Sequence, residues 1–250
     1  MATAARREPP VVNTTALLRA DRLTVHIGPI AILSELSFAV QAGQVLGVIG
    51  PNGAGKTTAV EVLSGFRRGT SGDVLLDGRS IVRRSPTQRV RLGLARTFQE
   101  SPCIDGLTTG DHVRLALSAA GQRSANTSVA AMLERVGLAE HHSSAAASLS
   151  LGDRRMLDLA RALACFPRVL LLDEPFAGLN SEQEKRLEAA IRSHTNAGGG
   201  VLIIEHRLAL LRDTTDTVIA LVQGTCVAAG SMQEVLDDAT VRSAYLGQAG

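Results

Sequence analysis

The first and last thirds of the chain carry short apolar runs of strand length, separated by turns that contain glycine. In the first third, the runs that predict strands cover residues 23–25, 36–40, 45–49 and 74–76. In the last third, runs at 169–172 and 201–204 are apolar throughout, which is typical of parallel strands covered on both faces. Residues 217–221 and 225–228 flank a Gln223-Gly224 turn and predict a hairpin.

Apolar residues at helical spacing predict helices between these strands. The segments with this pattern are 56–66 in the first third and 109–120, 129–136 and 155–164 in the middle. Strand patterns are absent from about residue 100 to residue 166. In the last third, Ser181 with Glu184 predicts a capping box for a helix that ends near Gly198, and Ser231 with Glu234 predicts another. The alternation of strands and helices predicts an α/β fold with a mostly parallel sheet, an antiparallel β portion and an inserted helical subdomain.

The 250 residues suit a single domain. We expect a core formed by residues 19–98 and 166–250, a helical subdomain at about 99–165, and a disordered extension at 1–18. No apolar run approaches the roughly 20 residues that a membrane span needs. With no secretory signal pattern at the start, we expect the protein in the cytoplasm.

Composition narrows the classes of function. The net charge is only +2 and aromatic residues make up 2%, so we expect no nucleic-acid partner. The three cysteines lie far apart in no metal-ligand spacing, which predicts ordinary thiols.

The strongest local motif is a phosphate-binding loop, G-x-x-x-x-G-K-[ST], placed between a predicted strand and a predicted helix. Glycines allow backbone N–H groups to turn toward phosphate oxygens, and the helix N-terminus adds a positive dipole end. In this motif the lysine contacts the β- and γ-phosphates and the hydroxyl that follows can bind Mg²⁺. The candidate residues are Gly50, Pro51, Asn52, Gly53, Ala54, Gly55, Lys56, Thr57 and Thr58.

Two carboxylates follow the predicted strand at 169–172. Ligands of open α/β sheets bind at the carboxyl ends of strands, so Asp173 is a candidate to hold Mg²⁺ beside Thr57. Glu174 is a candidate to polarise the attacking water. Taken alone, the Asp-Glu-Pro sequence is also compatible with a simple turn after a strand.

Further motifs follow in an order that resembles the ATP-binding-cassette (ABC) ATPases, a branch of the P-loop NTPases. Gln99 in ARTFQE matches the Q-loop glutamine, and LSLGD at 149–153 matches the signature. LLLDEP matches the Walker B strand, AGLN at 177–180 the D-loop, and His206 in VLIIEH the switch histidine.

The resemblance implies an ATPase with ATP and Mg²⁺ as cofactors. It implies that Gln99 senses Mg²⁺ and the attacking water, and that His206 holds the γ-phosphate and Glu174. Lys56, Gln99, Glu174 and His206 are the implied catalytic residues, and Thr57, Gln99 and Asp173 the implied metal ligands. Ser150 and Gly152 are implied to contact ATP bound to a facing subunit.

Finer features resemble the branched-chain amino-acid transporter subfamily: GLARTFQ at 93–99, Asn180 in the D-loop, IIEH, and AYLG at 244–247. The resemblance implies a subunit that energises an importer of branched-chain amino acids or a similar small polar solute, peripheral on the inner face of the membrane. Its implied partners are transmembrane permease subunits, a second ATP-binding subunit in a heterodimer and, indirectly, an external solute-binding protein. A urea- or amide-type importer and a regulatory nucleotide-binding module with little turnover remain the alternatives.

Two departures from the family pattern bear on mechanism. No aromatic residue precedes Phe38, so His26 or Ile27 must take the place of the aromatic that usually stacks on adenine. The signature carries Leu151 and Asp153 where Gly and Gln are usual.

Overall fold

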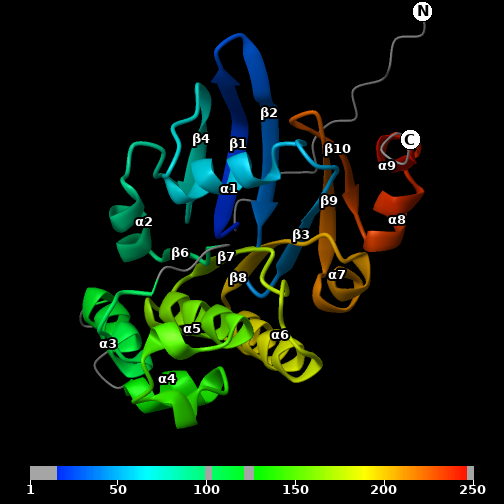
Figure 1. The fold of residues 1–250 in the computed structure, drawn as a ribbon. Coiled ribbons are helices and arrows are strands. Elements are labelled where there is room, and N and C mark those ends of the chain that lie inside the picture. Colours follow the sequence, from blue (N-terminus) through cyan, green and yellow to red (C-terminus); the bar gives the residue numbers. More distant parts are fainter. Residues whose placement is uncertain (1–15, 99–102, 121–126, 247–250) are drawn as a thin grey trace, which may run out of the picture.

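A computed structural model describes residues 16–98, 103–120 and 127–246 of the chain. Its strands form two sheets (Figure 1). The first is antiparallel, in the order β2-β1-β4-β5, with these bounds: β1 (Leu18–Ile27), β2 (Ile30–Val40), β4 (Ser71–Leu76) and β5 (Arg79–Ser80).

The second sheet is the parallel one that the continuous apolar runs predict. Its order is β10-β9-β3-β8-β7-β6, and only the edge strand β10 runs antiparallel to its neighbour. The strands are β3 (Val45–Ile49), β6 (Leu94–Arg96), β7 (Val169–Asp173), β8 (Gly200–Ile204), β9 (Thr217–Val222) and β10 (Thr225–Gly230). Every residue of β3, β7 and β8 is buried, which confirms the prediction of strands covered on both faces.

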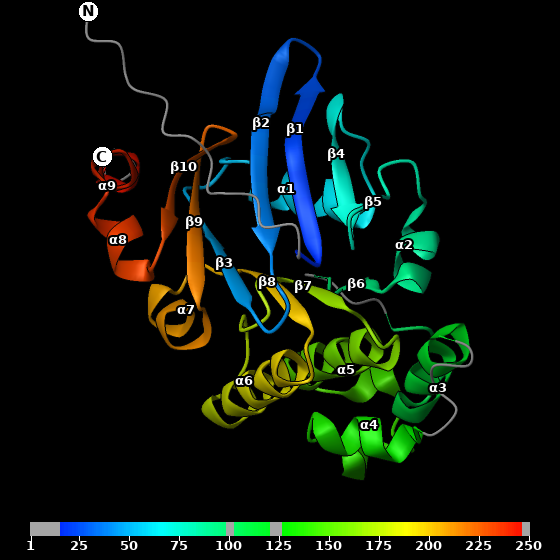
Figure 2. The same ribbon diagram turned by 180° about the vertical axis from the view of Figure 1, so that it is seen from behind.

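The helices divide between the two sheets. In Figures 1 and 2, α1 and α2 lie with the four-stranded sheet, and α3, α4, α5 and α6 lie on the opposite side of the six-stranded sheet. The longer helices are α1 (Lys56–Ser64), α3 (Thr109–Ala120), α5 (Leu151–Ala164), α6 (Ser181–Asn196) and α9 (Ala239–Leu246). The shorter ones are α2 (Pro86–Leu92), α4 (Val129–Arg135), α7 (Leu208–Thr214) and α8 (Met232–Asp237), with 3-10 turns at Ala139–His141 and Ala146–Ser148.

Two apolar cores face opposite sides of the six-stranded sheet. One joins that sheet to α1 and the four-stranded sheet, through residues such as Leu46, Leu63 and Leu171. The other joins it to α3, α4, α5 and α6, through residues such as Leu159 and Leu172. Alternate residues of one strand are buried in different cores, so the strand is held on both faces. The loops at its ends are thereby held in place as well.

The structure corrects several details. The N-cap of α6 is Asn180, one residue before the predicted Ser181. The Asn180 side chain accepts hydrogen bonds from the Glu182 and Gln183 N–H groups, and Gln183 completes the capping box. The box at Ser231 and Glu234 is confirmed. Leu17 and Leu18, assigned above to the extension, are buried, and β1 begins at Leu18.

Residues 1–15 of the predicted extension lie outside the described residues. In the described part of residues 100–166, no strand is present, and an isolated bridge joins Thr108 to Ala145. The boundaries of core and helical subdomain remain predictions. Within residues 16–98, 103–120 and 127–246, none of the helices is long and apolar enough to cross a membrane.

Candidate nucleotide site

The phosphate-binding loop connects the buried strand β3 to α1, as its motif predicts. Gly50, Gly53 and Gly55 have φ values of 151°, 79° and 98°, which L side chains rarely adopt. A Cβ on Gly50 would lie 2.2 Å from the Leu221 carbonyl oxygen, and a Cβ on Gly55 would lie 2.7 Å from Leu33 Cδ2. The glycines therefore serve both the turn and the close approach of the neighbouring strands.

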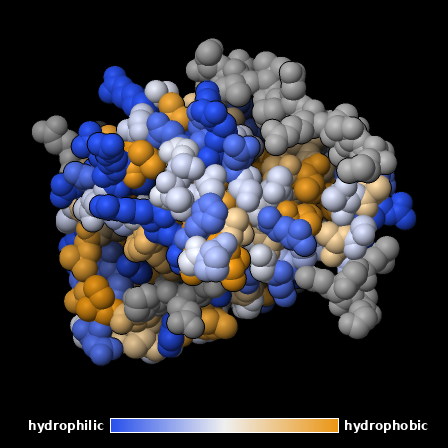
Figure 3. All heavy atoms as spheres, turned by 90° about the horizontal axis from the view of Figure 1, so that it is seen from above, coloured by the Kyte–Doolittle hydropathy of each residue, from blue (hydrophilic) through white to orange (hydrophobic). Residues whose placement is uncertain are grey.

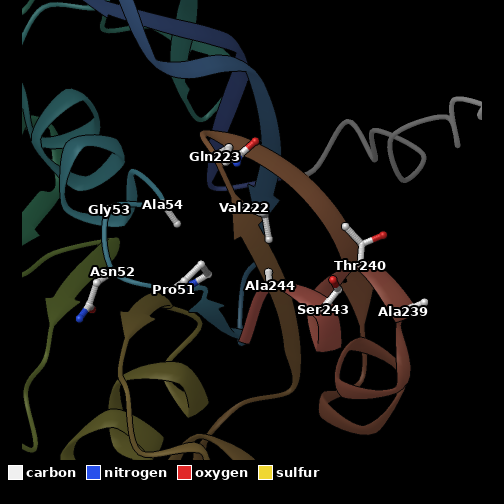
Figure 4. Close-up of a pocket in the computed structure, with 10 residues that line it drawn as sticks. All are labelled: Pro51, Asn52, Gly53, Ala54, Val222, Gln223, Ala239, Thr240, Ser243 and Ala244. Carbon is white, nitrogen blue, oxygen red and sulfur yellow. The ribbon is translucent and has the colours of Figure 1, made fainter. Parts of the chain in front are cut away.

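The turn of the β9–β10 hairpin braces this loop from one side. Gly224 N–H donates to the Ala54 carbonyl at 3.0 Å, and the Gly224 carbonyl accepts from Ser34 N–H at 3.0 Å. A pocket lies between the loop, the hairpin turn and α9, lined by Pro51, Val222 and Ser243 among others (Figure 4). Helix α9 was not predicted as a wall of this region, because its only chemical signal in the sequence is the short AYLG match.

Lys56 is the first residue of α1 and is 7% exposed. Its Nζ donates to the carbonyl oxygens of Gly50 at 2.7 Å and Pro51 at 3.0 Å. Burial lowers the pKa of the ammonium, and the charges of Glu174 and Asp173 oppose that shift. Thr57 is exposed and Thr58 half-buried at the same helix end, with Asn52 and Gly53 exposed in the loop before it. The cation and the open helix N-terminus thus face the same region, as phosphate binding requires.

Asp173 ends β7 and is 1% exposed. Its Oδ2 accepts a hydrogen bond from Arg96 Nη2 at 3.1 Å, and its Oδ1 is buried with no partner among the described residues. Burial raises the pKa of this carboxyl, and the nearby Arg96 charge opposes the rise. A buried carboxylate oxygen with a free lone pair beside a phosphate-binding loop fits a Mg²⁺ ligand.

Glu174 and His206 meet across the ends of the adjacent strands β7 and β8. Glu174 Oε1 lies 2.8 Å from His206 Nε2, and Glu174 N–H donates to the Ile204 carbonyl at 2.9 Å. Glu174 has a φ of 49°, in the left-handed region that non-glycine residues rarely adopt. The two carboxylates expected at this edge therefore have different partners, as their different candidate roles require.

Two residues next to His206 were not singled out from the sequence. Glu205 is 5% exposed, and its Oε1 accepts from the N–H groups of His206 at 2.9 Å and Arg207 at 3.2 Å. Arg207 donates to the Phe176 carbonyl at 2.9 Å and pairs with Glu184 at 2.8 Å. Both hold the backbone that carries His206. The available signal was the charged pair flanking a histidine directly after a buried strand.

The signature and the D-loop form a separate hydrogen-bonded unit at the start of α5 and α6. Ser150 Oγ donates to Asp153 Oδ2 at 2.6 Å and accepts from Asp153 N–H at 3.1 Å. Gln183 Nε2 donates to Asp153 Oδ1 at 2.8 Å. Leu151 is 63% exposed, and a Cβ on Gly178 of the D-loop would lie 3.1 Å from its Cδ2.

Ser150 is exposed and Gly152 is buried, and a Cβ on Gly152 would come 2.3 Å from Gln183 Oε1. Within the described part of the chain, no hydrogen bond or ion pair joins Ser150 or Asp153 to the phosphate-binding loop. That the signature serves another subunit stays a prediction. Gln99 lies outside the described residues.

The β1–β2 hairpin presents aliphatic side chains where the base is expected. Ile27 is 51% exposed and Ile30 is 63% exposed, and these residues pair at the hairpin tip. Two residues further along β2, the Ile32 carbonyl oxygen would lie 2.9 Å from a Cβ on Gly55 of the loop. At this end of the molecule, hydrophilic residues alternate with small groups of hydrophobic ones (Figure 3).

The fold and the site define a P-loop protein of the ATP-binding-cassette class. The chain matches the ABC transporter family over residues 33–177. It is 34% identical to the high-affinity branched-chain amino acid transport ATP-binding protein LivG of Salmonella typhimurium, over 93% of this chain and 98% of that protein. It is 35% identical to the corresponding BraF protein of Pseudomonas aeruginosa, with the same coverage.

A solved structure gives the same result. The ADP conformation of MJ1267, an ATP-binding cassette of an ABC transporter, has a TM-score of 0.82 to this chain at 26% identity, covering 93% and 99% of the two chains. The chain belongs to the ABC transporter family. It is a nucleotide-binding ATPase of the ABC transporter type.

Proposed function

We propose that this chain is the ATP-hydrolysing subunit that energises an importer of branched-chain amino acids or a similar small polar solute. The names of the LivG and BraF relatives, which align over almost their whole length, support this solute class. The observation that carries the hydrolytic role is the 2.8 Å contact between Glu174 and His206 at the strand ends beside the phosphate-binding loop. A regulatory module with little turnover has no need of this pair.

The residues divide the reaction among them. Lys56 exchanges its two backbone carbonyl partners for phosphate oxygens. Backbone N–H groups within Gly50–Thr58, which Pro51 lacks, donate to the phosphates. Thr57 and Asp173, with Gln99, would hold Mg²⁺, which would supply charge compensation on the phosphates. Glu174 orients and deprotonates the attacking water, and His206 keeps that carboxylate in position beside the γ-phosphate. Catalysis is therefore mainly positioning and electrostatic stabilisation.

We further propose that the catalytic dimer is a heterodimer with a second ATP-binding subunit. Ser150 and Gly152 would contact ATP held by that partner. In this chain, however, the Ser150 hydroxyl already donates to Asp153, a carboxylate that occupies the hydroxyl in place of a phosphate. Arg154 donates to the Leu149 carbonyl at 3.1 Å and Arg155 to the Phe98 carbonyl at 3.4 Å. Among the described residues, neither arginine forms an ion pair with Asp153 that would offset its charge.

Two such signatures facing each other would form a poor homodimer, because each adds a carboxylate near an anionic triphosphate. A partner with a better signature would complete the site of this chain. The proposed location is the inner face of the cell membrane, on permease subunits that receive solute from an external binding protein.

Solute uptake by cells that lack this chain tests the proposal. Labelled leucine uptake should fall on deletion and return with the wild-type gene, but not with Glu174→Gln. Urea uptake serves as the comparison. If urea uptake depends on this chain and leucine uptake does not, the chain serves the alternative, urea-type importer. If neither uptake depends on this chain, the proposed import role is wrong.

A further inference from the structure

Arg96 lies between the candidate metal site and the segment that leads to Gln99. It is the last residue of β6, which pairs in parallel with β7, so its side chain starts beside the strand that ends at Asp173. Its Nη2 is 3.1 Å from Asp173 Oδ2, and the two side chains are 10% and 0% exposed. None of the motifs discussed above gives this arginine a role.

Arg96 is the cation in direct contact with Asp173. Lys56, the other nearby cation, is engaged by the carbonyls of Gly50 and Pro51. A buried carboxylate without a partner is costly, so the guanidinium stabilises the charged form of Asp173. The same guanidinium lies where it opposes the approach of a second cation to that carboxylate.

The remaining contacts of Arg96 are weak. Its Nη1 is 3.4 Å from Ser64 Oγ, and its Nε has no partner among the described residues. The guanidinium carbon lies 5.3 Å from the centre of the Phe98 ring, which in turn meets Phe66 edge-on at 5.4 Å. An aromatic face of this kind can keep a guanidinium after its carboxylate contact is lost.

We propose that Arg96 is the internal counter-ion of Asp173 and that it competes with nucleotide-bound Mg²⁺ for this carboxylate. When Mg²⁺ binds, the guanidinium loses its contact with Asp173 and stays on Phe98, one residue before Gln99. Arg96 is thus a positioning residue that transmits occupancy of the metal site to residues 96–98, which lead to Gln99. The inference rests on the proposed function, in which Asp173 is a metal ligand.

The test compares the dissociation constant of the non-hydrolysable analogue AMP-PNP in excess EDTA with that in saturating Mg²⁺. In Arg96→Gln, metal-free binding should weaken because Asp173 faces the phosphates uncompensated, and Mg²⁺-dependent binding should hold or tighten. The dissociation constant in EDTA divided by that in Mg²⁺ should rise about tenfold or more, because the substitution removes the full positive charge of Arg96 beside Asp173. Arg96→Lys keeps the charge and should leave the ratio within about threefold of wild type.

A purely structural role would weaken binding in parallel in both conditions, and an unchanged ratio in folded Arg96→Gln overturns the inference. Asp173→Asn separates the two claims. If Asp173→Asn abolishes the Mg²⁺ effect and Arg96→Gln does not alter it, the proposed function stands and the counter-ion role fails. If Asp173→Asn leaves the Mg²⁺ effect intact, the assignment of Asp173 itself is wrong.

The unmodified chain offers a second measurement should Arg96→Gln fail to fold. Phe98 N–H donates to Asp158 at 2.7 Å, so its hydrogen exchange reports on this segment. Adding Mg²⁺ to chain saturated with AMP-PNP should change exchange at residues 96–98 and leave strand β9 unchanged. No change at 96–98 contradicts the proposed displacement.

Discussion

Glu174 Oε1 lies 2.8 Å from His206 Nε2, although 31 residues separate the two positions along the chain. Parallel pairing of β7 with β8 brings the two strand ends together, and Glu205 holds the backbone after β8 by accepting from His206 N–H. The pair is therefore built into the edge of the sheet.

Lys56→Ala should weaken ATP binding by about tenfold or more, because it removes the point charge on the phosphates. Lys185→Ala is a matched control, since Lys185 is the only other lysine and is exposed on α6. Binding can be measured by calorimetry. Equal affinities of the two variants would remove Lys56 from the phosphate site.

Discrimination between ATP and GTP should be poor. The hairpin tip offers Ile27 and Ile30, which provide apolar contact but no hydrogen bond to distinguish the bases. We expect dissociation constants that differ by less than about 30-fold, or about 2 kcal/mol. A larger preference for ATP would reveal a base-specific contact elsewhere.

Asp153→Gln should raise the ATPase activity of the purified chain, which we expect to be low. The substitution removes the carboxylate that accepts a hydrogen bond from the Ser150 hydroxyl. Gln at this position can still form a capping box with Ser150. Asp105→Asn, at an exposed position away from the signature, controls for a general effect of charge. Robust cooperative hydrolysis by the unmodified chain, with no change in Asp153→Gln, argues against the heterodimer.

The Cys226 thiol should react slowly with iodoacetamide. Burial raises its pKa from 9.0 to about 11, so the reactive thiolate is scarce at neutral pH. In a variant with Cys103 and Cys165 replaced by Ser, the alkylation rate should keep rising with pH toward about 11. In urea, where the thiol is no longer buried, the rate should reach a plateau once the pH passes the ordinary pKa of cysteine, 9.0. The same plateau in the folded chain contradicts this placement of the thiol.

The sequence predicts the parts of this fold that periodicity and special residues specify. The continuous apolar runs correspond to β7 and β8, and the glycine-rich loop leads to α1 as expected. The three-residue strand β6 was missed because it is too short to show a period, and it becomes a strand only by pairing with β7. Helix α2 was missed although Ser85 and Gln88 form its capping box.

The site divides in the same way. Motifs point to Lys56, Asp173 and His206, whose residue types the chemistry requires. They do not reveal Arg96 or Glu205, because the role of each depends on a contact made across neighbouring strands or with the backbone. The use of Asp153 to engage Ser150 could be suspected from the altered signature, but the partner Gln183 comes from a helix 30 residues away in the chain.

Hydrolysis by Glu174→Gln and His206→Ala, singly and together, tests the central claim most directly. The experiment measures ATP binding and steady-state turnover of the chain assembled with its partner subunits, with Glu140→Gln as a control at an exposed glutamate. Glu174→Gln should keep ATP binding and lose about 10²–10⁴-fold in turnover, the usual contribution of a positioned base. Because the two residues act as a unit, the double variant should be little slower than Glu174→Gln alone. Near-normal turnover in Glu174→Gln would contradict the account.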